Sequence, residues 1–83
     1  MFSVDYSISG NGIWITSEFI CYPSITKLKE ETYEVLTKLL TNSEATDGEY
    51  FIQATISENG EYYDNDEWSV NFKNGKVSFN SEG

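Results

Sequence analysis

The side chains best suited to chemistry are three carboxylates and an amide that follow one another directly, at Asp64, Asn65, Asp66 and Glu67. Oxygen ligands of this kind suit a calcium ion. The spacing and the glycine of an EF-hand loop are missing, however, and adjacent residues of a strand point to opposite faces of a sheet. We therefore expect an acidic stretch that faces solvent, and no metal site.

The chain lacks the other groups on which most catalysis depends. It contains no histidine and one cysteine, Cys21, so a nucleophile would have no imidazole base and the common zinc sites are excluded. A carboxylate pair for glycoside hydrolysis would need a cleft, for which 83 residues leave little room. The glycines between Ser9 and Gly12 join two predicted strands rather than a strand and a helix, so they form no phosphate loop. We expect no enzymatic activity and no cofactor.

Alternating apolar residues predict a hairpin at the start of the chain. Every second residue from Phe2 to Ile8 is apolar, which is the period of a half-buried strand. A tight turn is expected at residues 10–11 or 11–12, because Asn-Gly chemistry favours such turns. A second strand should follow from Ile13 to about Tyr22, with Phe19 on the core face. The face assignment is the same for both turns.

A helix is predicted after Pro23. Ser24 suits the N-cap position, and Thr26 is the alternative cap. Residues at helical spacing then form one largely apolar stripe, made of Ile25, Leu28, Thr32, Val35, Leu36, Leu39 and Leu40. This stripe is expected to pack on the sheet, while the other side of the helix carries three of the five lysines.

Three more strands are predicted in the second half of the chain. The first covers Glu49 to Ser57, and the turns after it are expected at Asn59-Gly60 and within Lys73 to Lys76. Regular pairing across Asn59-Gly60 would put Trp68 on the face away from the core. One extra residue would reverse this, so a β-bulge is predicted within Asp64 to Asp66.

The expected fold class is α+β. An antiparallel five-stranded sheet in ββαβββ order would carry one helix packed on one face, within a single domain of residues 1–83. The last residues, Asn80 to Gly83, are expected to form a frayed tail.

The sheet face away from the helix is expected to combine aromatic and acidic side chains. From the first hairpin it would show Asp5, Trp14, Glu18, Ile20 and Tyr22, and from the second Phe51, Gln53, Thr55, Tyr62, Asp64 and Glu67. Aromatic anchors with a rim of carboxylates are typical of a protein interface. The alternative is that Trp14 and Phe51 only cover each other.

Negative charge is concentrated in one part of the chain. The formal net charge is −9, and eight of the fourteen acidic residues lie between Glu44 and Glu67, a stretch without lysine. Such a chain repels nucleic acids and anionic membranes, so the expected partner is a basic protein, and a homodimer is also open. The candidate partner-binding residues are Asp5, Trp14, Glu18, Glu49, Glu58, Glu61, Asp64, Asp66 and Glu67.

The spacing of carboxylates on a strand suggests what they could imitate. Residues on one face of a strand recur every ~6.7 Å, close to two axial steps of ~3.4 Å between phosphates of one DNA strand. The leading hypothesis is a small acidic inhibitor, a DNA mimic that blocks a basic nucleic-acid-binding enzyme or defence complex. Phage anti-restriction, anti-CRISPR and glycosylase-inhibitor proteins are similar in small size, acidity and lack of catalytic residues, and no motif assigns the chain to one of these families.

Two other functions fit the same composition. An immunity protein or antitoxin that neutralises a cognate basic nuclease would need nearly the same surface. An acidic adaptor domain, whose charge serves only solubility, would need none. The lone Cys21 and the lack of a basic, apolar leader favour a cytoplasmic location, that of a bacterial host if the protein is phage-encoded.

Overall fold

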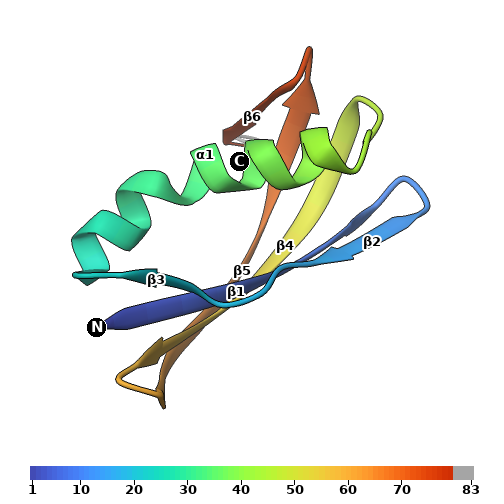
Figure 1. Ribbon diagram of the computed structural model, residues 1–83. Helices are drawn as coiled ribbons and strands as arrows, with labels where there is room; N and C mark the ends of the chain where they lie inside the picture. Colours follow the sequence, from blue (N-terminus) through green and yellow to red (C-terminus); the bar gives the residue numbers. More distant parts are fainter. Residues whose placement is uncertain (80–83) are drawn as a thin grey trace.

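The computed structural model describes residues 1–79, and in it one helix lies across one face of an antiparallel sheet (Figure 1). The elements are β1 (Phe2–Gly10), β2 (Ile13–Thr16), β3 (Ile20–Tyr22), α1 (Ile25–Asn42), β4 (Gly48–Glu58), β5 (Glu61–Lys73) and β6 (Lys76–Phe79). Five strands follow the order β2-β1-β4-β5-β6, and β3 pairs with the other half of β1. The predicted α+β class is confirmed, with six strands instead of five. The tail predicted at residues 80–83 lies outside the described residues.

The second predicted strand is two short strands with different registers. Ser7 pairs with Thr16 in β2, whereas Val4 pairs with Ile20 in β3, so the register shifts by one residue along β1. A one-residue shift turns the following side chains to the opposite face of the sheet. Where the strands separate, the Ser17 side chain takes over a backbone contact, because its Oγ accepts a hydrogen bond of 2.8 Å from the Tyr6 amide.

This shift overturns three expectations about the first hairpin. Ile20 and Tyr22 were expected on the outward face, but Ile20 packs against the core and Tyr22 is only 5% exposed. Phe19 was expected in the core and is 61% exposed. The turn itself lies at Asn11-Gly12, since Gly10 pairs with Ile13, which is one of the two predicted positions.

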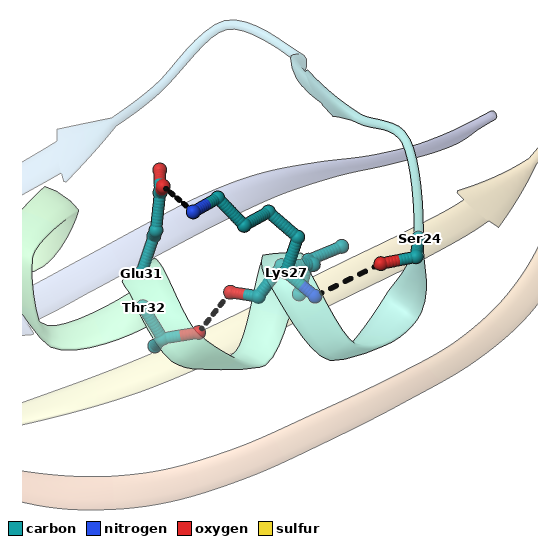
Figure 2. A network of polar contacts seen from close by, with 5 residues as sticks. Ser24, Lys27, Glu31 and Thr32 are labelled. Atoms are coloured by element: carbon teal, nitrogen blue, oxygen red, sulfur yellow. Dashed lines mark hydrogen bonds and ion pairs between the residues drawn. The ribbon is translucent and has the colours of Figure 1, made fainter.

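The helix begins where the sequence predicts it. Ser24 is the N-cap, and its Oγ accepts a hydrogen bond of 3.1 Å from the Lys27 amide (Figure 2). One turn further, the Lys27 ammonium lies 3.2 Å from a Glu31 carboxylate oxygen, and the Thr32 hydroxyl donates to the Leu28 carbonyl. The predicted stripe faces the sheet, with Leu28, Leu36 and Leu40 buried. No helix within residues 1–79 is long and apolar enough to cross a membrane.

The core lies between this stripe and one face of the sheet, to which β1, β3, β4, β5 and β6 contribute buried residues. Alternate residues of β1 and β4 supply most of it, in register, as in the pairs Val4↔Ile56, Tyr6↔Ala54 and Ile8↔Ile52. The buried hydrophobic residues are Val4, Tyr6, Ile8, Tyr22, Leu28, Leu36, Leu40, Tyr50, Ile52, Ala54, Ile56, Val70, Phe72 and Val77.

The predicted β-bulge is present, but one residue earlier than expected. Ile56 pairs with Asp64 and Ser57 pairs with Tyr62, so Tyr63 is the extra residue of β5. The bulge has the predicted consequence, because Trp68 lies opposite Ile52 and faces the core side. It also brings Asp64 to the helix side of the sheet, opposite Ile56, so the expectation that Asp64 faces outward is wrong.

Candidate interaction surface

The outer end of the β4–β5 hairpin carries the densest group of carboxylates. We call residues 58–67 the acidic arm; its acidic residues are Glu58, Glu61, Asp64, Asp66 and Glu67. All residues from Glu61 to Glu67 are exposed, so both faces of β5 are wet along this stretch. The lysines lie elsewhere, on α1 and at the turn between β5 and β6. Figure 1 shows the hairpin extending past the end of the helix-covered region.

The turn of the arm has the backbone conformation of a tight hairpin turn. Asn59 and Gly60 both have positive φ, of 52° and 85°, as the tight turns that match the twist of a hairpin require. The flanking residues Glu58 and Glu61 pair directly, which places two like charges opposite each other at a cost in stability. The amino group of Met1 reaches the tip and donates a hydrogen bond of 2.8 Å to Asn59 Oδ1.

The carboxylates of β5 are divided between the two faces of the strand. Asp64 and Asp66 lie on the helix side, opposite Ile56 and Ala54. Glu67 lies on the outward side, where its Oε2 accepts a hydrogen bond of 3.1 Å from Gln53 Nε2. The arm therefore presents negative charge around the open side of β5 rather than on one flat face.

Two of these aspartates also bind their own strand. Asp64 Oδ1 accepts a hydrogen bond of 2.8 Å from the Asn65 amide, and Asp66 Oδ1 accepts one of 2.9 Å from the Glu67 amide. Each contact holds one oxygen of the carboxylate close to the backbone of β5.

The remaining predicted partner-binding residues lie outside the arm, although Asp5 lines one hollow together with the arm residues Asn65, Asp66 and Glu67. Asp5, Trp14 and Glu49 are on the outward face of β1, β2 and β4, and Glu18 is in the connection between β2 and β3. Trp14 is 75% exposed, and its Nε1 donates a hydrogen bond of 2.8 Å to Ser7 Oγ. The candidate residues therefore form one cluster, the arm, and several scattered positions.

The outward face is less acidic than predicted. Between Asp5 and Glu67 it carries hydroxyl and amide side chains. Those of Ser7, Gln53, Thr55 and Asn65 line a polar hollow of about 160 Å³, together with the acidic residues Asp5, Asp66 and Glu67. Asp5 Oδ1 is buried there and has no hydrogen-bond partner within residues 1–79. The concentration of charge is along β5, not across this face.

Sequence reasoning missed a groove between the helix and the sheet. It has a volume of about 350 Å³ and opens beside the arm; its lining residues are Tyr6, Leu28, Lys29, Thr32, Tyr33, Ala54, Ile56, Asp66, Trp68 and Phe79. Tyr33 and Phe79 meet edge-on, with ring centroids 6.5 Å apart. Burial raises the pKa of the Tyr33 phenol above its ordinary value. The available signal was Tyr33 itself, an aromatic residue at the margin of the apolar stripe.

The part of the chain that the structure describes contains no metal-binding arrangement. Across residues 1–79, no three histidine, cysteine, aspartate or glutamate side chains come together in a way that could hold an ion. Cys21 is a free, exposed thiol. What the surface offers is fixed negative charge beside an aromatic groove.

Comparison with protein-family models, with curated proteins and with solved structures finds no match for this chain.

Proposed function

We propose that this protein is a small acidic inhibitor that blocks a basic nucleic-acid-binding enzyme or defence complex by occupying the surface on which that enzyme holds nucleic acid. The observation that carries the proposal is the acidic arm, which has five carboxylates within residues 58–67 and no lysine. A basic groove built for phosphates attracts such a surface and is complementary to it.

The geometry of the arm supports mimicry of a phosphate row. Asp64 and Asp66 project from the same face of an extended strand, and such positions are ~6.7 Å apart along the strand. Glu67 adds a negative charge on the other face.

The test is a capture experiment with matched charge variants. The wild-type protein, immobilised, is exposed to bacterial lysate, and the captured proteins are identified by mass spectrometry. The arm variant Glu58→Lys, Glu61→Lys, Asp64→Lys and the control variant Glu30→Lys, Glu34→Lys, Glu44→Lys change the net charge equally. The proposal expects a basic nucleic-acid-binding protein that the wild type and the control capture and the arm variant does not.

Competition then separates mimicry from other acidic contacts. Duplex DNA or RNA should displace the protein from the captured partner, and the protein should inhibit the partner's activity on nucleic acid. A partner bound equally by both charge variants, and not displaced by nucleic acid, would contradict the proposal. A partner that is a nuclease toxin neutralised outside its nucleic-acid groove would favour an immunity protein instead.

A further inference from the structure

Within residues 1–79, the arm half of β5 has one edge that no strand pairs with. β5 runs from Glu61 to Lys73, but β6 pairs with it only from Val70 to Lys73. Within residues 1–79, no strand lies beside Glu61 to Ser69 on the side away from β4, and Figure 1 shows β6 next to only one end of β5. A row of backbone donors and acceptors of this length is a ready template for another strand.

Two backbone amides of this edge donate to side chains rather than to a neighbouring strand. Consecutive residues of a strand direct their amide groups to opposite sides. The amides of Asn65 and Glu67 bond to Asp64 Oδ1 and Asp66 Oδ1, so they belong to the side away from β4. Rotation of one aspartate side chain would release each amide, and the carboxylate could then accept a hydrogen bond from a partner. We call these two side chains, Asp64 and Asp66, the covers of the edge.

The charge of the edge selects which strand can pair with it. The edge carries four negative residues, Glu61, Asp64, Asp66 and Glu67. The nearest lysine of β5 is Lys73, which lies in the part of the strand that pairs with β6. A second copy of the same edge would bring carboxylates opposite carboxylates, which is unfavourable. A strand with lysine or arginine at alternate positions would instead place cations opposite Asp64 and Asp66, which share the helix side of β5.

The groove under α1 gives such a strand a place for its side chains. It opens between Asp66 and Trp68 of β5 on one side and Lys29 and Tyr33 of α1 on the other, so a basic side chain that enters must keep its charged end on the Asp66 side, away from Lys29. The helix-side side chains of an added strand would enter there. A long basic side chain could lay its apolar stem on the aromatic rings and keep its charged end at Asp66, as lysine and arginine do on other aromatic surfaces.

We propose that an extended, basic segment of a partner protein adds to β5 as a further strand along Glu61 to Ser69, with the Asp64 and Asp66 covers opening to pair with its cations. The inference deepens the proposed function, on which it rests only for the basic character of the partner. It assigns the contact to backbone pairing along one edge as well as to charge.

The experiment uses the full-length protein and two synthetic peptides. One peptide alternates lysine and valine over about nine residues, enough to cover the free edge of extended strand. The other has the same sequence with N-methyl groups on alternate amides, which preserve its charge and remove its hydrogen bonds to an edge. Amide chemical shifts and hydrogen exchange are measured residue by residue. The unmethylated peptide should shift the Asn65 and Glu67 amides and slow their exchange, and should bind at least about tenfold more tightly than the methylated one.

A pair of protein variants tests the same edge from the other side. Glu67→Pro removes an amide that points away from β4, so no hydrogen bond to β4 is lost. Glu67→Gln removes the charge and keeps the amide. Peptide binding should be lost in the first and largely retained in the second. Equal binding of the two peptides, or shifts confined to residues outside 61–69, would overturn the proposal. A basic partner that binds the arm while the edge amides stay unchanged would overturn strand addition and leave the inhibitor function standing.

Discussion

Phe2 and Tyr63 meet edge-on, with ring centroids 5.1 Å apart and ring planes at 87°, although their strands β1 and β5 are separated by β4. The contact exists because Tyr63 is the extra residue of the bulge and is free of ladder pairing. It ties the start of the chain to the base of the acidic arm.

The Phe2–Tyr63 contact should support the arm. Tyr63→Ala removes the ring pair and is expected to lower the free energy of unfolding by about 1 kcal/mol, the usual worth of such pairs. Urea unfolding followed by circular dichroism measures the change.

Deletion of Tyr63 should remove the bulge and let Ile56 and Asp64 follow Ser57 and Tyr62 in regular pairing. Trp68 should then stay on the core side, and a solvent-exposed Trp68 in the deletion variant would contradict this account of the bulge.

The N-cap of the helix should contribute measurably. Ser24→Ala removes the acceptor of the Lys27 amide and is expected to cost about 1 kcal/mol of unfolding free energy. Thr26→Ala is the matched control, because Thr26 is exposed and lies within the first turn. Equal destabilisation by both variants in urea titrations would show that Ser24 does not act as the cap.

Two buried tyrosines should respond in opposite ways to loss of the hydroxyl. The Tyr50 hydroxyl donates a hydrogen bond of 2.6 Å to the Thr46 carbonyl, whereas the Tyr22 hydroxyl is buried without a partner in the described part of the chain. Tyr50→Phe is therefore expected to lower the free energy of unfolding by about 1 kcal/mol, and Tyr22→Phe to leave it unchanged or raise it. Thermal unfolding of both variants checks this, and a larger loss in Tyr22→Phe would contradict it.

Stability should fall in alkaline solution. Burial raises the pKa of the Tyr6 and Tyr22 phenols, and the Glu31 and Glu34 carboxylates raise that of Tyr22 further. In the unfolded chain these phenols ionise near the ordinary pKa of about 10. Below that pH both states hold the proton, and above it the unfolded chain releases it first, so the free energy of unfolding falls as pH rises through the folded-state values.

Urea titrations between about pH 8 and pH 11 measure this dependence on either side of the ordinary tyrosine pKa. Tyr22→Phe should make the alkaline fall shallower, because one of the phenols with a raised pKa is gone. An unchanged slope in that variant would show that Tyr22 does not contribute.

Local pattern was enough to predict most of the fold. The alternation of apolar and polar residues predicted β1 and β4, and the Asn-Gly pairs predicted the turns that join the strands of each hairpin. Ser24 predicted the start of the helix. The bulge followed from a conflict between regular pairing and the burial of Trp68, which is a whole-strand argument. Its position was missed because any extra residue before Trp68 resolves that conflict equally well.

The register break between β2 and β3 could not be predicted in the same way. The stretch from Ile13 to Tyr22 keeps enough apolar residues to suggest one strand, and the break depends on the Ser17 hydroxyl bonding to the Tyr6 amide across the sheet.

The candidate site was predicted in part. Clustering of acidic residues in the sequence located the arm, but the division of its carboxylates between the two faces of β5 depends on the bulge. The groove depends on where the helix lies across the sheet, which the local sequence pattern does not give.

We propose that the acidic arm is the surface that binds a basic partner in place of nucleic acid. The most direct measurement is the Kd of the captured partner for the wild type, the arm variant and the control variant over a range of salt concentrations. The wild type and the control should bind alike and weaken as salt rises, while the arm variant should bind at least about tenfold more weakly, ~1.4 kcal/mol, with a smaller dependence on salt. Equal Kd values for the two variants, or wild-type binding that does not change with salt, would contradict the claim.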